Sequence, residues 1–225
     1  MKRPLIVNEI DLEQEGVKII KLPPIKLSTR KVEKKEVDGR DGTLTEYDGY
    51  TNDTKNVEAD YKGDNPLKIL SILNDAKEVV FGNLPDRYYK CQLDNQIPME
   101  QVIENQLYNF LISFDCQPFG YLLEGKEPII LNQPIVVDNP GTYKSKPIIS
   151  VYGTGACTLT INNKAFYISE IGGVITLDSD IEEVHEDKGQ YFETDAFPVF
   201  AIGSNNITWT GNVTRVEIIP NWRCL

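Results

Sequence analysis

The side chains that could perform chemistry are few in this 225-residue sequence, and they do not form a catalytic pattern. The one histidine, His185, lies in an acidic stretch that runs from Asp178 to Asp187. A histidine among carboxylates could serve as a general base with a raised pKa. No partner residue recurs at a spacing that would support this role, so we favour a solvated strand edge and loop.

The spacing of the residues also gives little support for a metal site or for disulfide bonds. An EF-hand calcium loop needs oxygen ligands at alternate positions and a glycine at the sixth, and Val184 and His185 break that pattern. The cysteines stand far apart without a Cys-x-x-Cys pair, which argues against a zinc site and a disulfide framework. We therefore expect reduced, mostly buried thiols, no metal site and no cofactor. The cysteines are Cys91, Cys116, Cys157 and Cys224.

Motifs of common enzyme classes are missing from the sequence. It contains no phosphate-binding loop, dinucleotide-binding glycine pattern, nucleophile elbow or zinc-protease motif, so we expect a protein that is not an enzyme. Tyr191, Trp209 and Trp222 could line a sugar-binding face, although tryptophans in β domains belong more often to the core. A carbohydrate-binding β-sandwich module is therefore the alternative function.

Charge and hydropathy narrow the possible partners. A formal net charge of -11 argues against nucleic-acid binding, because phosphate contacts need clustered Lys and Arg. Glu9 and Asp11 interrupt the apolar run that a signal peptide requires, and no run approaches the roughly 20 residues that span a bilayer. We expect a protein without nucleic-acid or membrane partners, made and kept in a cytoplasm unless it leaves inside a larger particle.

The elements that would position these residues are mostly short strands. Apolar and polar residues alternate over 57–61, 158–161 and 213–218, which predicts strands with one solvated face. The sequence has 13 prolines and 16 glycines, and pairs such as Asp48-Gly49 suit tight turns. The segment 99–107 is open to helix and strand, and we favour a strand.

One helix is predicted near residue 66. Asp64 or Asn65 can cap it, Pro66 can occupy its first position, and it should end near Ala76, before a strand at 79–82. Its expected apolar face comprises Leu67, Leu70, Ile72 and Leu73.

Prolines mark the expected domain boundary. Four of them fall between residues 118 and 140, among short apolar runs, and proline is tolerated at strand edges and in linkers rather than in central strands. We therefore expect an N-terminal β domain that carries the helix over residues 1–132. A second, all-β domain is expected over residues 133–225.

A charged segment at 31–37, followed by a glycine-rich turn, predicts a long polar hairpin. Such a hairpin cannot bury much surface on its own domain. It is either a solvated edge protected by lysines or an arm that pairs with a neighbouring copy, and spacing alone leaves both open. The candidate inter-subunit arm residues are Lys31, Glu33, Lys34, Lys35, Asp38, Gly39, Arg40, Asp41 and Gly42.

Two blocks of the sequence resemble the distal tail proteins (Dit) of long-tailed phages. The N-terminal block comprises the turn at 37–42, the helix, the segment 83–90 and the segment 114–119. The C-terminal block comprises residues 147–155, 175–178, 197–209 and 216–223, and it includes Gly203 and Asn205 at the entry to a hairpin. Together, in this order, the blocks cover nearly the whole chain.

The resemblance implies a mainly β protein with two sandwich-like domains, the first with one α-helix and a long hairpin arm, the second galectin-like. It also implies a homo-hexameric ring at the distal tip of the tail in the virion, made in the host bacterial cytoplasm. One ring face would meet the major tail tube protein, and the other a tail-associated lysin or fibre hub protein. Receptor-binding proteins or side fibres would dock on the C-terminal domains.

In that ring the hairpin would act as a belt around the neighbouring subunit, where Arg40 could pair with an acidic residue. The C-terminal domain has roughly 90 residues, which is enough for one plain sandwich. An inserted sugar-binding module is therefore not expected, and neither is direct adhesion of this chain to the host.

Overall fold

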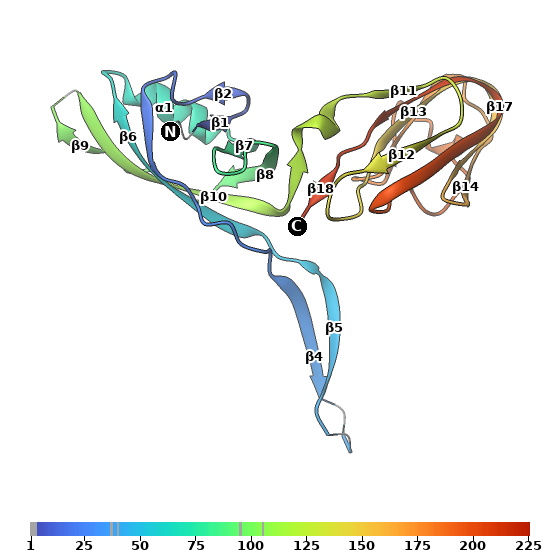
Figure 1. Cartoon of the computed structure of the whole chain (residues 1–225), viewed down its shortest axis with the longest axis horizontal. Helices are drawn as coiled ribbons and strands as arrows, with labels where there is room; N and C mark the ends of the chain where they lie inside the picture. Colours follow the sequence, from blue (N-terminus) through green and yellow to red (C-terminus); the bar gives the residue numbers. More distant parts are fainter. Residues whose placement is uncertain (1–3, 37, 40, 95, 105) are drawn as a thin grey trace. The chain divides into compact units, whose positions relative to one another are not determined.

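The structure, a computed structural model, describes residues 4–36, 38–39, 41–94, 96–104 and 106–225. The chain is mainly β, as predicted, and it divides into two compact units (Figure 1). The N-terminal unit runs to Gly120 and includes Leu225, and the C-terminal unit spans Tyr121–Cys224. Within the described ranges, no helix combines the length and the apolar character that crossing a bilayer requires.

Antiparallel strands build the N-terminal unit. They are β1 (Leu5–Val7), β2 (Ile10–Asp11), β3 (Val17–Lys21), β4 (Arg30–Glu36), β5 (Thr43–Tyr50), β6 (Asp53–Lys62), β7 (Glu78–Phe81), β8 (Arg87–Leu93), β9 (Glu100–Ile103) and β10 (Leu107–Leu122). Across the main sheet the order is β2-β1-β7-β8-β10-β6-β3, and β9 pairs with β10. The favoured strand within 99–107 is therefore confirmed by β9. β4 and β5 form a separate two-stranded sheet.

Alternation of apolar residues places the core on one face of the main sheet. On β6, Val57, Ala59 and Tyr61 are buried, and the residues between them are more exposed. Phe110 lies opposite Ala59 and Ile112 lies opposite Val57, so the buried residues of β10 continue the same apolar face. This register is strongly specified, because a slip of one residue would move the whole set to the solvent face.

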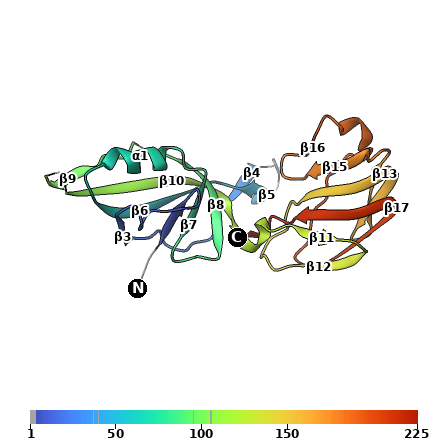
Figure 2. The ribbon, with the colours of Figure 1, turned by 90° about the horizontal axis from the view of Figure 1, so that it is seen from above.

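The helix α1 (Pro66–Asn74) covers one face of the sheet (Figure 2). It begins as predicted, with Pro66 in the first turn and the Asn65 side chain accepting a hydrogen bond from the backbone N–H of Lys68. The predicted apolar face was only partly right, because Ile69 and Leu73 are the buried residues while Leu67 is 73% exposed. Ile69 and Leu73 are four residues apart and therefore share one side of the helix.

The C-terminal unit is formed by shorter strands around two long ones. Its strands are β11 (Ile129–Leu131), β12 (Ile135–Asn139), β13 (Ile148–Ile161), β14 (Lys164–Ile168), β15 (Gly173–Asp178), β16 (Glu183–Val184), β17 (Gly203–Ile219) and β18 (Arg223–Cys224), with 3-10 turns at Leu123–Lys126 and Gly189–Tyr191. The sheet order is β11-β17-β13-β15-β16, with β12 added to β17 and β14 added to β13, whereas β18 pairs with β10.

The long strands β13 and β17 bend together, which curls this sheet around its core. Residues 148–153 of β13 pair with β15, and residues 157–161 pair with β14. Between these parts the register with β17 shifts near Gly211, whose φ is +94°. A Cβ at this glycine would lie 2.4 Å from the Ala156 carbonyl oxygen. Bulges of this kind bend a strand pair, so the buried side chains of both halves meet in one core.

The two units divide at Gly120 and Tyr121, about a dozen residues before the predicted boundary at 132. The reason is that β11 pairs with β17, and both Leu122 and Leu131 are buried in the C-terminal core. The prolines that suggested a linker flank edge strands instead. Pro134, for example, directly precedes β12, a position where its missing N–H is tolerated.

Candidate functional site

The predicted charged hairpin is formed by β4 and β5, which extend from the N-terminal unit (Figure 1). We call residues 30–50 the arm. Every residue of β4 is exposed, and so is every residue of β5 up to Gly49. In the part of the chain that the structure describes, these strands pair only with each other. A two-stranded ribbon in water is only marginally stable, so the arm gains little from its own unit.

Charged side chains cover the arm. Glu33 lies directly opposite Glu46, a like-charged pair that by itself destabilises the ribbon. The Lys35 ammonium offsets this, because it lies 2.8 Å from the Glu46 carboxylate and 3.7 Å from that of Glu33. The Arg30 guanidinium lies 5.6 Å from the centre of the Tyr47 ring. All these groups are exposed, so each contact contributes less than about 1 kcal/mol within the subunit.

The turn of the arm contains the remaining predicted residues. Gly39 and Gly42 have positive φ angles of 78° and 84°, as the glycine-rich pattern requires. Asp38 and Asp41 are exposed, as are Lys31 and Lys34 on β4. Arg40 lies outside the described residues, and its pairing with an acidic group of a neighbouring subunit stays a prediction.

The root of the arm is fixed by a partly buried charge cluster. Lys26, before β4, and Lys55, on β6, both pair with the Asp53 carboxylate, at 2.6 and 3.0 Å. The Lys55 ammonium also lies 4.7 Å from the centre of the Tyr89 ring. Burial alone would raise the pKa of Asp53, but the hydrogen bonds and charges of the two lysines lower it below its ordinary value. The cluster therefore joins the segments that enter and leave the arm.

The acidic stretch around His185 forms the end of β15, a turn and the strand β16 at the edge of the sheet. The Asp178 carboxylate accepts the backbone N–H of Asp180 at 2.9 Å and lies 3.8 Å from the His185 ring nitrogen Nε2. The turn therefore uses Asp178 as a local cap. Among the described residues, no group of three or more His, Cys, Asp or Glu side chains could hold a metal ion.

The three aromatic residues considered for sugar binding pack against the C-terminal core. Trp222 is buried, and its ring lies 5.7 Å from that of Phe200. Trp209 and Tyr191 are partly buried against the same cluster. These three side chains therefore do not form the exposed aromatic row that a sugar-binding face requires.

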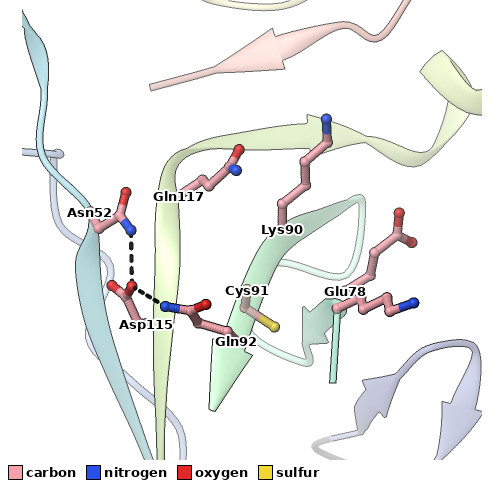
Figure 3. A pocket seen from close by; sticks show the side chains of 8 residues that line it. Asn52, Glu78, Lys90, Cys91, Gln92, Asp115 and Gln117 are labelled. Atoms are coloured by element: carbon pink, nitrogen blue, oxygen red, sulfur yellow. Dashed lines mark hydrogen bonds between the residues drawn. The ribbon is translucent and has the colours of Figure 1, made fainter. Parts of the chain in front are cut away.

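A polar pocket of about 370 Å³ opens on the N-terminal unit, beside β7, β8 and β10 (Figure 3). The Asp115 carboxylate accepts hydrogen bonds from the side-chain amides of Asn52, at 2.9 Å, and Gln92, at 3.3 Å. Two amides thus hold this carboxylate in place. The pocket is lined by Asn52, Lys77, Glu78, Lys90, Cys91, Gln92, Asp115 and Gln117.

Sequence reasoning missed both this pocket and the Asp53 cluster. Asp115 and Gln92 meet only because β8 and β10 are neighbours in the sheet, and Lys26 meets Asp53 only because the arm returns to its starting point. A partial signal was the lysine at position 55 within the alternating strand 53–62, where an inward-facing charge requires a partner.

Comparisons of the sequence with protein-family models and with curated proteins give no match. Comparison of the structure gives matches over nearly the full length. The Dit protein of phage SPP1, described as a paradigm of the hub adsorption apparatus in phages that infect Gram-positive bacteria, aligns with a TM-score of 0.69 at 12% identity. The alignment covers 97% of this chain and 98% of that one.

Baseplate structures give further matches. A chain of the phage P2 baseplate, in its activated conformation with calcium, aligns with a TM-score of 0.55 at 8% identity, covering 97% of both chains. The corresponding strontium structure gives the same values. Over nearly its whole length, the chain therefore has the fold of a Dit hub protein of a phage tail.

Proposed function

We propose that the chain is a structural, non-catalytic hub subunit of a phage tail tip, where six copies form a ring in the virion. The observation that carries this proposal is the full-length match to the SPP1 Dit protein, which includes both units. A partial match would be expected if only a common β-sandwich were shared. The exposed arm supports the proposal independently, because all described residues of β4, and those of β5 up to Gly49, are exposed, and the two strands pair with each other alone among the described strands.

In this ring the arm wraps around the neighbouring subunit. The ring faces contact the major tail tube protein on one side and a tail-associated lysin or fibre hub protein on the other. The galectin-like C-terminal units carry receptor-binding proteins or side fibres. Stable contacts of this kind bury more than about 1,000 Å² each, which the exposed arm and the unit surfaces together can supply.

Light scattering after size-exclusion chromatography, together with electron microscopy, tests the proposal. The full chain should form a six-fold particle at high protein concentration. A variant in which residues 31–49 are replaced by Asn-Gly should lose the ring and keep its unfolding temperature, because the replaced residues that the structure describes are exposed. Arg30 and Tyr50 face each other across the ribbon, so a short turn can join them.

Charge reversal provides a matched comparison. Lys34→Glu with Lys35→Glu should weaken ring formation, whereas Lys144→Glu with Lys164→Glu, two exposed lysines of the C-terminal unit, should not. Equal effects of the two pairs would argue against a specific role of the arm. A strict monomer at all concentrations that binds glycans on an array would instead favour the carbohydrate-binding alternative.

A further inference from the structure

Two of the four cysteines face each other across neighbouring strands. The side chain of Gln92 donates to Asp115, and the backbone N–H of Asp94 donates to the Ser113 carbonyl at 2.9 Å. Each step forward along β8 is thus matched by one step back along β10, which is the register of an antiparallel pair. This register places Cys91 directly opposite Cys116.

The backbone hydrogen bonds show whether Cys91 and Cys116 form a hydrogen-bonded or a non-hydrogen-bonded pair of the antiparallel sheet. The N–H of Cys91 donates to the Lys77 carbonyl at 2.8 Å, on the side away from β10. In an antiparallel sheet a residue directs its N–H and C=O to the same neighbour, so Cys91 and Cys116 form a non-hydrogen-bonded pair. The Cα atoms of such pairs lie about 4.5 Å apart, with close side chains, which is within the range that disulfides span.

The two thiols also share one face and differ in exposure. Cys116 is fully buried in the N-terminal core, and Cys91 packs partly against the same core. Cys91 is partly exposed and is among the residues that line the polar pocket (Figure 3), so of the two side chains Cys91 is the one that a small molecule meets first.

We propose that Cys91 and Cys116 are an oxidisable pair that forms a disulfide when the folded chain meets a small-molecule disulfide. The Cys91 thiolate attacks the small disulfide, forms a mixed disulfide and releases one thiol. The Cys116 sulfur then gives up its proton and attacks the Cys91 sulfur, which releases the second thiol. Two cysteine thiols are oxidised, and one small disulfide is reduced to two thiols.

The surroundings of the two sulfurs set the order of these steps. The hydrogen bond with Cys91 and burial both raise the pKa of the Cys116 thiol, so this sulfur is seldom a thiolate. The nearby charges of Lys55 and Asp53, on β6, act in opposite directions on it. Cys91 therefore reacts first with the external disulfide, and Cys116 resolves the mixed disulfide from inside the core.

Oxidised glutathione is the probe for this proposal. The folded full chain is incubated with it, free cysteines are then blocked, and the protein is digested for mass spectrometry. We expect the loss of two of the four free thiols and one linked peptide pair, Cys91 with Cys116, while Cys157 and Cys224 stay free. A product that stops at glutathione on Cys91, four unreacted thiols, or links spread over all cysteines would each overturn the proposal.

Two variants and one condition serve as controls. Cys157→Ser should keep the Cys91–Cys116 link, and Cys91→Ser should leave the buried Cys116 unreacted. In denaturant, where the strands no longer hold the register, the links should spread over all four cysteines. The peptide map of the unaltered chain decides the matter even if Cys91→Ser does not fold, and the result does not depend on whether the chain forms a ring.

Discussion

Asp53 sits between two lysines at the root of the arm, with its side chain 15% exposed and that of Lys55 9% exposed. Replacing it by Asn leaves the Lys55 ammonium in the core without its counter-charge. Because the cluster is partly reached by solvent, we expect Asp53→Asn to lower the free energy of unfolding by about 2 kcal/mol, somewhat less than a fully buried pair would lose. Urea unfolding at neutral pH measures this.

The pH dependence of this loss has a definite sign. The pKa of Asp53 is lower in the folded chain than its ordinary value of 3.8, so its stabilising effect is complete above that value. The effect is lost as the pH falls through the lower, folded-state pKa. The stability difference between the natural chain and Asp53→Asn should therefore be constant above about pH 5 and shrink below 3.8.

Asp86→Asn is the control for this prediction. The Arg87 guanidinium also lowers the pKa of Asp86, but the Asp86 side chain is 53% exposed. Its loss should cost less than about 1 kcal/mol. Equal destabilisation by the two substitutions would show that burial of the Asp53 cluster has no energetic importance.

Asn205 is fully buried, and both the oxygen and the nitrogen of its side-chain amide form hydrogen bonds. The oxygen accepts from the Ala201 N–H at 2.8 Å and from the Asn162 amide at 2.7 Å, and the nitrogen donates to the carbonyls of Ala201 and Gly203. Asn205→Ala should destabilise the C-terminal unit by about 3 kcal/mol, because these groups would be left buried without partners.

Thermal unfolding followed by circular dichroism measures the Asn205 effect, with the exposed neighbour Asn206 as the matched position. Asn206→Ala should change the stability by less than about 0.5 kcal/mol. If both variants unfold at the same temperature, water replaces the four hydrogen bonds of Asn205 in the Asn205→Ala variant, and the prediction is wrong.

The sequence showed Gly203 and Asn205 only as a family-like pattern. The structure supplies the reason for it: a positive φ of 75° at Gly203 and a buried amide two residues later.

Among the secondary-structure elements, the β4–β5 ribbon of the arm makes few contacts that exclude water. Every side chain from Arg30 to Glu36 is exposed, and the ribbon pairs with no other strand in the described part of the chain. Backbone amides in such a ribbon exchange readily with solvent. In dilute solution, where any ring is dissociated, hydrogen exchange by mass spectrometry should show fast exchange in β4 and β5 and slow exchange in β6 and β10.

Assembly should reverse this pattern in the arm alone. At concentrations where a ring forms, β4 and β5 should become protected while β6 and β10 stay as they are. Strong protection of the arm in the dilute monomer would contradict the prediction. Unchanged fast exchange in an assembled ring would show that the arm is not part of the subunit contacts.

The sequence predicts a helix, strand or hairpin well where the residues of that element alone determine its structure. The cap at Asn65, the strand alternation at 57–61 and the charged hairpin are local patterns, and each is present in the structure. The buried side of α1 was harder, because residues 67, 69, 70, 72 and 73 are all apolar and allow more than one stripe. Only packing against the sheet selects Ile69 and Leu73.

Pairings between distant strands could not be predicted in the same way. Nothing in the residues of β8 indicates that β10 is its neighbour, yet that neighbourhood creates the polar pocket and brings Cys91 opposite Cys116. The same holds for the bend near Gly211, which depends on the shifted register between β13 and β17. The chemistry of the pocket is therefore a property of sheet order rather than of any segment.

For the whole molecule, the position of the boundary between the units can be tested by dissection. A fragment of residues 121–225 contains all members of the C-terminal core, including Leu122 and Leu131. A fragment of residues 133–225, which follows the proline-based prediction, lacks both leucines and the strand that pairs with residues 216–218 of β17. The longer fragment should unfold cooperatively, and the shorter one should not.

The size of the expected difference follows from the side chains removed. Each buried leucine contributes about 2 to 5 kcal/mol when its deletion leaves a cavity. Two such losses, added to the hydrogen bonds of β11, approach the 5 to 15 kcal/mol that typically stabilises a whole domain. Urea denaturation of both fragments, followed by tryptophan fluorescence, measures the difference, since each retains Trp209 and Trp222. Equal, cooperative unfolding of the two fragments would move the boundary back to residue 132 and make residues 121–132 a linker.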